Sequence, residues 1–488
     1  MSFIKRTQVD YIENFYRHKL YCKQTNHYLL TTDTGNFIFL NQPSFRNLKK
    51  GFITNQATFD SLESKGFIIT LNNINQIIEQ TKKRYSFLDN GTSLHIVIPT
   101  HRCNLNCVYC FASSCDMNAN IEQTDMSIKT AEKITQFIME SPSRAITIEF
   151  QGGEPTARFD IIQAIVEKAN KLNKTLQKDL RFALVSNFTL LNDKIVDWLI
   201  DHNVTFCTSL DGPKYVHDKN RFILNKKFNN INEINKKQVE VIGSYEKVIY
   251  WINRINEKYK QKKIPLKVNA LLTITKYSLD YYKEIIDEYI NLDINIIDLR
   301  PLTQIGRALK EKETIFYTRN QFVEFYQKSL DYIDELTQKG IKIEDRIKVL
   351  FNSKILLNKP TYHTDYESPC GALTGQIVYH TNGNIYTCNE ALGRDELKIG
   401  DVFNDTWQNL FKKKEVSKAI LNSMLENNSK CDRCVYKPYC GTCMVENFYN
   451  LSKFNFYPEK TFKHHEVTFH CERFFDSVLA QIKKKYYK

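Results

Sequence analysis

Residues 101–110, with the sequence His-Arg-Cys-Asn-Leu-Asn-Cys-Val-Tyr-Cys, contain three cysteines, Cys103, Cys107 and Cys110, directly after an apolar stretch that predicts a β-strand. Thiolates at this spacing select soft metals, so the loop predicts an iron–sulfur cluster or a zinc site. A closed structural zinc site takes four ligands. Three cysteines on a 4Fe–4S cluster instead leave one iron open to a small molecule. The alternative is a zinc knuckle that takes His101 as its fourth ligand.

This loop opens a region in which strands and helices alternate. Between the strands lie amphipathic stretches, such as the one that places Ile128, Ala131, Ile134 and Ile138 on one helical face. Such alternation implies parallel strands with right-handed crossovers. Six units are too few for a closed eightfold barrel, so we expect an α/β fold with a partial (β/α)6 TIM-like barrel and its chemistry at the carboxyl ends of the strands. The predicted strands are Ser93–Thr100, Ala145–Phe150, Arg181–Ser186, Val204–Leu210, Leu266–Ile274 and Asn295–Leu302.

The N-terminal residues predict a small module of a different kind. Residues 28–40 are expected to form two strands joined at Asp33-Thr34-Gly35, a hairpin signal. Thr54 or Asn55 can cap a helix, and residues 65–70 predict a returning strand. A hairpin with short helices indicates a winged-helix-like module. Residues 71–91 predict a polar helical linker.

A second group of cysteines lies in the last third of the chain. Seven thiols are more than a single zinc ion can use, so they predict either auxiliary iron–sulfur clusters or a pair of structural zinc-ribbon-like sites. The group consists of Cys370, Cys388, Cys431, Cys434, Cys440, Cys443 and Cys471. Of the remaining cysteines, Cys22 and Cys115 fit no pattern, and Cys207, inside a predicted strand, is expected in the core.

Composition limits the setting. The 488 residues are enough for two or three domains, and no apolar run is long enough to span a membrane. Because ten of the thirteen cysteines fall in metal-ligand patterns and the start of the chain has no apolar signal core, we expect a reducing, cytoplasmic location. The net charge of +13 could attract nucleic acid. No basic helix or aromatic-basic motif accompanies it, so nucleic acid is not the expected partner.

The stretch Gln151-Gly152-Gly153-Glu154-Pro155 follows the second predicted strand. Paired glycines let a backbone approach a ligand closely, and a carboxylate beside them can receive an ammonium group. The loop of three cysteines, with Tyr109 before the third, and the stretch 151–155 together resemble the signature of the radical S-adenosylmethionine (SAM) enzymes. The resemblance implies that the cluster on the three cysteines binds SAM, and that Gly152, Gly153, Glu154 and Pro155 hold its methionine amino group.

Polar residues at two further strand ends extend this predicted cofactor site. Ser186 and Asn187 end the third strand and suit a ribose. His217, Asp218 and Arg221 follow the fourth. In related maturases an arginine of such a stretch meets the cofactor carboxylate, so the resemblance implies this role for Arg221. The alternative is a surface salt bridge between Arg221 and Asp218.

The second cysteine group resembles the SPASM domain, an extension of radical SAM enzymes that carries auxiliary clusters. The resemblance implies one cluster on Cys431, Cys434, Cys440 and Cys471, and another on Cys370, Cys388 and Cys443. Two departures from the family pattern are visible. Only Gly441 and Thr442 separate Cys440 from Cys443, and no further cysteine follows Cys370 closely, so this cluster is expected to keep an open iron.

Longer phrases narrow the resemblance to the His-Xaa-Ser system radical SAM maturases. It implies a ribosomally made precursor peptide, hydrogen abstraction by a 5′-deoxyadenosyl radical, a side-chain cross-link, and an electron donor such as flavodoxin or ferredoxin. It also implies that the N-terminal module binds the leader of the peptide by strand addition; a cap on the next domain is the alternative. The phrases are Ser93-Leu94-His95, Ile148–Pro155, Thr208–Pro213, Leu299-Arg300-Pro301 and Lys437–Gly441.

Three other functions stay open. A sulfatase-activating enzyme would oxidise a Cys or Ser of a protein substrate, a metal-binding interaction module would not be catalytic, and a radical enzyme could modify nucleic acid. The predicted regions are a peptide-recognition-like module with linker (1–91), a radical SAM partial barrel (92–310), a helical bridge (311–365) and a SPASM auxiliary-cluster domain (366–488).

Overall fold

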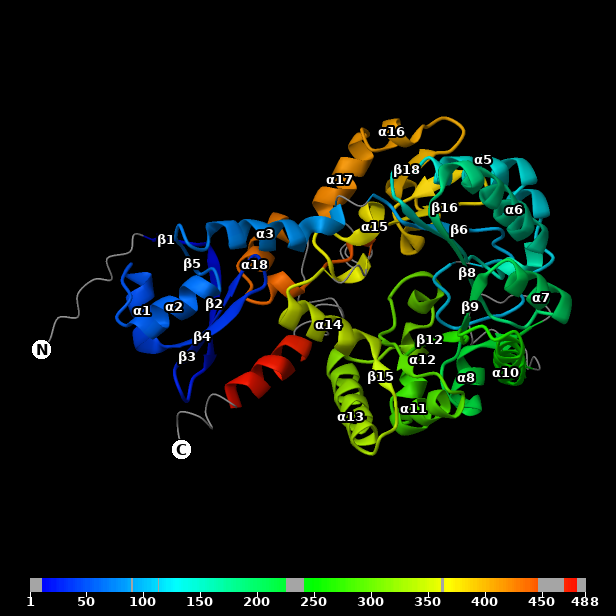
Figure 1. The fold of residues 1–488 in the computed structure, drawn as a ribbon. Coiled ribbons are helices and arrows are strands. Elements are labelled where there is room, and N and C mark those ends of the chain that lie inside the picture. Colours follow the sequence, from blue (N-terminus) through cyan, green and yellow to red (C-terminus); the bar gives the residue numbers. More distant parts are fainter. Residues whose placement is uncertain are drawn as a thin grey trace, which may run out of the picture.

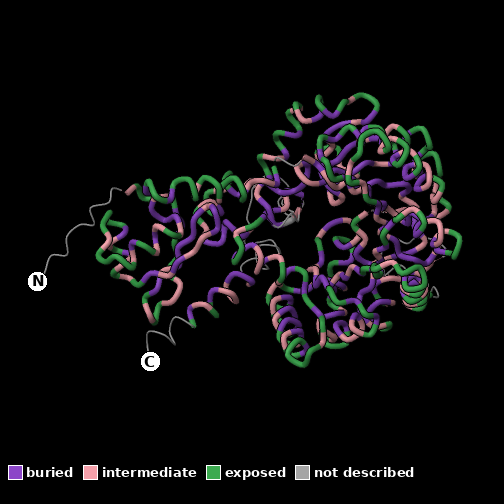
Figure 2. The backbone as a smooth tube through the Cα atoms, viewed as in Figure 1, coloured by how far each residue is buried: buried purple, intermediate pink, exposed green. Residues whose placement is uncertain are grey.

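The computed structural model describes residues 11–88, 91–112, 114–224, 241–360, 364–445 and 469–480. A small N-terminal module projects from a larger body in which helices surround a sheet (Figure 1). The strands of the body are mostly buried, whereas the exposed segments lie on the outer helices and loops (Figure 2). Within the described ranges, no helix combines the length and the apolar character that crossing a bilayer requires.

The N-terminal module is built on a three-stranded antiparallel sheet. Strands β2 (Tyr16–Cys22), β3 (His27–Thr32) and β4 (Phe37–Asn41) pair in this order, which confirms the predicted hairpin. Asn55 caps α2 (Gln56–Ser64), one of the two predicted caps. The sequence did not predict β2. The other elements are α1 (Gln42–Lys49), β5 (Ile68–Ile69) paired with β1 (Ile12–Glu13), and the linker helix α3 (Ile74–Tyr85).

The body is organised around a nine-stranded sheet, and six of its strands are parallel and adjacent in chain order, as predicted. The last predicted strand divides: β13 (Ile296–Ile297) pairs with β15 (Glu344–Asp345), and only β14 joins the large sheet. The six strands are β6 (Leu94–Val97), β7 (Ala145–Phe150), β8 (Asp179–Ser186), β9 (Val204–Ser209), β12 (Asn269–Thr273) and β14 (Leu299–Arg300).

The C-terminal region extends this sheet. Strand β16 (Gln376–Tyr379) runs parallel to β6, and β17 (Asn384–Tyr386) and β18 (Lys398–Asp401) follow it antiparallel. The region around Cys370 and Cys388 is therefore hydrogen-bonded to the first strand of the predicted barrel. The sequence did not predict this continuity.

Amphipathic helices between the strands bury the faces that the sequence predicts. Ala131, Ile134 and Ile138 of α5 are buried, but Ile128, the first residue of that helix, is 45% exposed. The connecting helices are α5 (Ile128–Met139), α6 (Phe159–Leu176), α7 (Asp193–Asp201), α8 (Lys214–Asn220), α10 (Tyr245–Gln261) and α11 (Tyr282–Asn291). Shorter helices are α4 (Ile121–Thr124), α12 (Lys312–Ile315), α15 (Gly371–Thr374), α16 (Trp407–Leu410), α17 (Lys414–Asn422) and α18 (Ser429–Asp432).

Two longer helices follow the parallel strands, and both lie within the predicted helical bridge, residues 311–365. Helix α13 (Arg319–Gln338) packs against α11, where the Tyr332 hydroxyl donates to Asp287 over 2.8 Å. Helix α14 (Arg346–Leu357) follows it. Residues 222–244 are rich in Lys and Asn and have little periodicity, so their sequence predicts a solvated insertion. It begins with β10 (Phe222–Ile223) and ends near β11 (Ile242–Gly243), and these two strands pair with each other. Its residues 225–240 lie outside the described ranges.

The N-terminal module docks on the C-terminal cysteine segment. Leu29 of β3 packs in one apolar cluster with Val435, Cys471 and Phe475. The Thr31 hydroxyl donates to the Val435 carbonyl over 2.8 Å. At the same interface Arg17, whose side chain is 1% exposed, lies 2.8 Å from an oxygen of Asp33. The module therefore covers the segment that carries the Cys431–Cys440 group.

Candidate functional site

The cysteine loop after β6 is held from both sides by backbone hydrogen bonds. The Cys103 amide donates to the Cys115 carbonyl over 3.0 Å, and the Cys115 amide donates to His101 over 2.8 Å. On the other side, the Val108 amide donates to the carbonyl of Asn220 over 3.0 Å. The loop therefore has a fixed backbone with residues 220–222 beside it. Cys115, which fits no cysteine pattern, closes the loop through its main chain.

Hydrogen-bond donors lie beside two of the three sulfur atoms of the loop, and the third, Cys110 Sγ, lies 3.5 Å from the Ser114 hydroxyl. Cys103 Sγ lies 3.4 Å from the Leu105 amide and 3.7 Å from Asn187 Nδ2. Cys107 Sγ lies 3.8 Å from Arg221 Nη1. Donors directed at sulfur stabilise thiolates and tune iron–sulfur clusters, so the residues present fit such a group. Within the described ranges, no three Cys, His, Asp or Glu side chains are grouped so as to hold a single metal ion.

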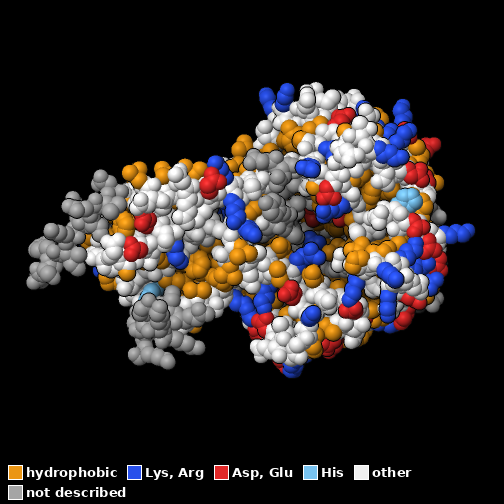
Figure 3. Space-filling model, in the orientation of Figure 1, with side chains coloured by type: hydrophobic (Ala, Val, Ile, Leu, Met, Phe, Trp, Pro, Cys, Tyr) orange, Lys and Arg blue, Asp and Glu red, His pale blue; other side chains and the backbone are white. Residues whose placement is uncertain are grey.

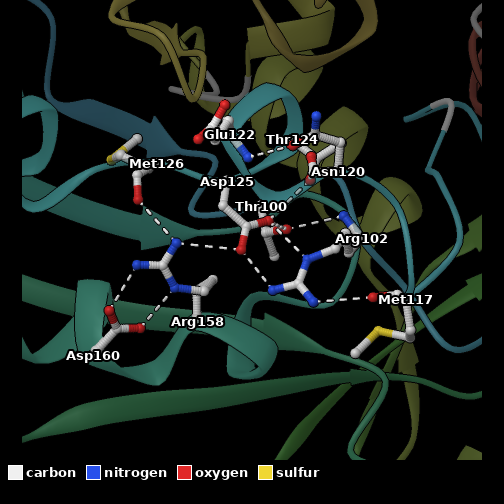
Figure 4. A network of polar contacts seen from close by, with 10 residues as sticks. All are labelled: Thr100, Arg102, Met117, Asn120, Glu122, Thr124, Asp125, Met126, Arg158 and Asp160. Atoms are coloured by element: carbon white, nitrogen blue, oxygen red, sulfur yellow. Dashed lines mark hydrogen bonds and ion pairs between the residues drawn. The ribbon is translucent and has the colours of Figure 1, made fainter.

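A buried carboxylate, Asp125, anchors the start of the loop (Figure 4). It accepts hydrogen bonds from Thr100 Oγ1 at 2.5 Å, Arg102 Nε at 2.9 Å and Arg158 Nη1 at 3.2 Å. Its side chain is only 1% exposed. Burial alone would raise the pKa of Asp125, but the bonds from Arg102 and Thr100 outweigh it and lower the pKa from 3.8 to about 2. Nothing in the sequence near Asp125 predicts this role.

Replacing Asp125 by asparagine should destabilise the protein by about 3 kcal/mol, because Arg102 and Arg158 would be left without their shared carboxylate. Since the folded-state pKa is depressed, this stabilisation is present above pH 4 and disappears as the pH falls toward 2. Denaturant unfolding at pH 7 measures the loss. The matched control is Asp160→Asn, because Asp160 is half exposed and pairs with Arg158 alone among the contacts in Figure 4. An equal loss of unfolding free energy in both variants would contradict the role given to the buried Asp125 carboxylate.

The two glycines after β7 have a structural task that the sequence did not predict. Gly152 has a φ of +132°, and an added Cβ there would lie 2.6 Å from the Thr100 carbonyl oxygen. At Gly153 it would lie 2.2 Å from the Arg102 oxygen. The amide of Gly153 donates to Thr100 over 2.9 Å. The glycines thus let the turn lie directly against the backbone of the cysteine loop, whereas their sequence predicted a close approach to a ligand.

Glu154 joins the predicted site residues of two strand ends. The fully buried carboxylate accepts hydrogen bonds from the Ser186 hydroxyl at 2.7 Å, the Asn187 amide at 2.8 Å and Thr156 Oγ1 at 2.5 Å. Burial raises the pKa of Glu154 against the effect of these bonds. Pro155 begins the 3-10 turn that follows. Because protein donors already occupy the carboxylate, its binding of a cofactor amino group stays a prediction.

Tyr109, Asp211 and Arg221 form a second buried polar group beside the loop. The Tyr109 hydroxyl donates to Asp211 over 2.6 Å and accepts from Arg221 Nε at 2.6 Å. The guanidinium also lies 3.4 Å from Asp211 and 5.1 Å from the centre of the Tyr109 ring. Burial acts to lower the pKa of Arg221, but electrostatic interactions with Tyr109, Cys107 and Asp211 outweigh it and raise the pKa. Arg221 is therefore held as a cation beside Cys107.

The alternative role of Arg221, a surface salt bridge with Asp218, is wrong. Asp218 pairs with Lys214 at 3.0 Å and accepts from the Tyr245 amide at 2.9 Å. His217 is buried, and its Nε2 lies 2.9 Å from the Ser244 hydroxyl. Of the three residues His217, Asp218 and Arg221, it is Arg221 whose side chain has identified contacts with the cysteine loop, at Tyr109 and Cys107.

The auxiliary cysteines fall into two places. Cys370, Cys388 and Cys443 line one cavity. Cys471 lies elsewhere, in the apolar cluster with Cys434 and Cys440. Its pKa is raised well above the usual value, mainly by burial and also by electrostatic interaction with Cys440 and Cys434. Cys431 is buried, and its carbonyl accepts from the Cys434 amide at 3.0 Å. This division matches the two predicted ligand sets, whose metal content stays a prediction.

The cavity has a volume of about 420 Å³ and lies between the inner faces of the parallel strands and these three cysteines. Strands β7, β9 and β12 contribute Glu149, Cys207 and Asn269. Cys207 was expected in the core, but it faces this cavity. The sequence placed Cys207 in a β-strand but did not indicate which face of the sheet its side chain lies on. Nor could it show that one face of the sheet borders a cavity. Gln151, directly before the two glycines, also lines the cavity.

Residues 97–288 match the model of the radical SAM superfamily. A cysteine-type anaerobic sulfatase-maturating enzyme of Clostridium novyi (strain NT) is 25% identical over 357 residues, which cover 71% of this chain and 86% of that enzyme. Among solved structures, anSMEcpe with bound AdoMet has a TM-score of 0.63 at 18% identity, covering 80% of this chain and 99% of that one. Streptococcus suis SuiB bound to precursor peptide SuiA has a TM-score of 0.51 at 16% identity, covering 91% and 98%.

Residues 97–288 therefore form a radical SAM domain, the class of domain that uses a 4Fe–4S cluster and S-adenosylmethionine. This confirms the predicted cofactor pair. The two solved structures extend the similarity of fold over most of the chain. A sulfatase-maturating enzyme and a protein that binds a precursor peptide are thus both among the proteins that this chain resembles.

Proposed function

We propose that the protein modifies a ribosomally synthesised peptide by radical chemistry and forms a side-chain cross-link. One observation carries the proposal: a cavity large enough for a peptide side chain lies between the radical SAM strands and a second set of three cysteines. Ligand sites of about 300–1,000 Å³ are typical for small molecules. A cross-link removes electrons from the substrate, and an auxiliary cluster on Cys370, Cys388 and Cys443 would lie where it could accept one.

The residues around the cysteine loop would bind and orient the cofactor. When bound, the cluster and SAM supply a 5′-deoxyadenosyl radical that removes a hydrogen atom from a substrate carbon. Arg221, held as a cation beside Cys107, would bind the cofactor carboxylate. Ser186 and Asn187 would face the ribose, and the glycine turn would support the methionine end. The buried strands would exclude water from the radical.

Replacing Arg221 by lysine should weaken SAM binding about tenfold while the iron content stays unchanged, because lysine keeps the charge but loses the planar fork. Equilibrium binding of SAM to the reconstituted protein measures the effect. Asp218→Asn is the matched control on the same turn, since Asp218 pairs with Lys214 and not with Arg221. Unchanged affinity in the lysine variant would remove Arg221 from the proposed site.

A peptide substrate is supported by the SuiB structure, which contains its precursor peptide. In this chain the N-terminal module, proposed to hold a leader, packs on the segment of the second auxiliary group. The phrases shared with the His-Xaa-Ser system maturases favour that kind of peptide. A flavodoxin or ferredoxin as electron donor and a cytoplasmic location belong to the same proposal. In Figure 3, acidic and basic side chains are interspersed on the visible face of the body, which gives no support to a nucleic-acid substrate.

The second candidate is oxidation of a Cys or Ser in a sulfatase-like protein. The relative from Clostridium novyi carries this name and aligns over most of its length. This candidate predicts oxidation of a single residue and no cross-link.

The test is anaerobic co-expression of the full chain with the short peptide encoded nearest its gene, followed by mass spectrometry of the peptide. We expect a loss of two hydrogens, with fragmentation locating a link between two residues. The Cys-containing peptide Cp18Cys, which is bound in an anSMEcpe structure, serves as the substrate of the second candidate. Oxidation of that peptide, with the co-expressed peptide unchanged, would favour sulfatase maturation over our proposal.

A further inference from the structure

The cavity between the parallel strands and Cys370, Cys388 and Cys443 carries charged side chains of both signs. Carboxylates come from Glu149, Asp298 and Glu390 and guanidinium groups from Arg300 and Arg346. An enclosed apolar space normally excludes unpaired charges, because taking them out of water is costly. Two of these carboxylates, Glu149 and Asp298, differ in whether the protein supplies them with a hydrogen-bond donor.

Glu149 has a protein partner. Its carboxylate accepts a hydrogen bond from the Gln151 side chain. Burial raises the pKa of Glu149, against the effects of Gln151 and Arg300. This carboxylate is therefore already tied to the strand end that leads into the Gly152 turn.

Asp298 differs from Glu149. Its side chain is 7% exposed, and among the described residues its Oδ1, shielded from solvent, has no hydrogen-bond partner. The other oxygen, Oδ2, is 3.9 Å from Arg300 Nε, too long for a hydrogen bond. Buried carboxylate oxygens without donors are rare, and each one needs an explanation.

The strand break explains how Asp298 reaches the cavity. Residues 296–297 pair with β15 and residues 299–300 pair with β12, so Asp298 lies where the chain passes from one strand to the other. Its carbonyl accepts the Arg300 amide at 2.8 Å, which fixes the bend. The side chain is therefore held on a rigid backbone beside the cavity that it lines, and its Oδ1 has no donor among the described residues.

We propose that Asp298 is a substrate-binding residue that accepts a hydrogen bond from a hydroxyl, thiol or ammonium group of the peptide side chain in this cavity. The inference rests on the proposed function and adds the class of side chain it selects. An acceptor-only carboxylate discriminates against apolar residues, since a buried polar group left without a partner costs more than the hydrogen bond contributes. Asp298 would thereby place a donor-bearing side chain beside Cys370, Cys388 and Cys443.

The first arm of the test needs no peptide. Thermal unfolding of the full chain is compared between wild type, Asp298→Asn and Asp298→Ala. If the Asp298 carboxylate binds substrate and does not stabilise the fold, its replacement should leave the unfolding midpoint unchanged or raise it by about 2 °C. Asp293→Asn, an exposed aspartate five positions earlier that pairs with Lys267, is the matched control. A midpoint lowered by several degrees only in the Asp298 variants would assign a structural role and overturn the proposal.

The second arm uses the co-expressed peptide and measures modified peptide and 5′-deoxyadenosine separately. Asp298→Asn should lower the ratio of modified peptide to 5′-deoxyadenosine at least tenfold. An unchanged ratio would overturn the proposal while leaving the proposed function standing. If wild-type protein makes 5′-deoxyadenosine but modifies no peptide, the proposed function fails for that peptide, and the thermal arm still decides whether Asp298 is structural.

Discussion

Replacing Cys107 by alanine should reduce formation of 5′-deoxyadenosine to the uncatalysed background. Cys107 is one of three thiols on the loop after β6, and it lies 3.8 Å from the buried Arg221 guanidinium. A 4Fe–4S cluster with one open iron needs all three cysteines as ligands to its other irons. The loss of one ligand should therefore abolish binding of the cluster and not merely weaken it. The measurement is chromatographic quantification of 5′-deoxyadenosine after anaerobic reconstitution with iron, sulfide and reductant.

Cys115→Ala is the control for this experiment. Cys115 belongs to the same loop and contributes main-chain bonds that alanine retains, but its thiol lies outside the three-cysteine pattern. We expect this variant to keep its iron and its 5′-deoxyadenosine formation. If Cys107→Ala and Cys115→Ala behaved alike, the cysteine pattern would not define the cluster ligands.

Replacing Cys471 by alanine should have the second-largest effect. Cys471 is fully buried and packs with Leu29 of the N-terminal module and Phe475. If it is a ligand of the second auxiliary cluster, its loss should lower the iron content by about four atoms per chain. Because the same apolar cluster joins the module to the body, we also expect the module to become sensitive to proteolysis, while cleavage of SAM at the first loop continues.

Iron analysis and limited proteolysis measure these two effects on the same samples. Cys22→Ala is the control, since Cys22 lies in β2 of the module and outside both auxiliary groups. Loss of iron without release of the module would separate the cluster from the docking. Unchanged iron would show that Cys471 is a core thiol and not a ligand.

Local sequence patterns predicted the strands, the hairpin and the residues at the strand ends. Glu154, Ser186 and Asn187 meet because the carboxyl ends of adjacent parallel strands lie side by side. Arg221 reaches the cysteine loop because residues 220–222 pair with the loop backbone. For Glu154, Ser186 and Asn187, spacing along the chain contained this information, since each lies at the end of its strand or within a few residues of it. Arg221 comes only after helix α8, and its role was implied by the resemblance alone.

Features that depend on contacts distant in the sequence were missed. Strand β2 begins with the buried pair Tyr16 and Arg17, so it lacks the alternation that marks a half-buried strand. Arg17 is buried because Asp33 and Asp432 pair with it, and Asp432 lies more than 400 residues away. For the same reason Asp125 was missed and Cys207 was expected in the core. The partners of Asp125 and the cavity that Cys207 faces appear only in three dimensions.

The most direct test of radical SAM chemistry at the first loop is electron paramagnetic resonance of the reconstituted, reduced protein with and without SAM, with 5′-deoxyadenosine measured in the same sample. The structure predicts a reduced 4Fe–4S signal that changes when SAM is added, together with 5′-deoxyadenosine. Purified protein that holds zinc in place of iron, shows no such signal and forms no 5′-deoxyadenosine would contradict it.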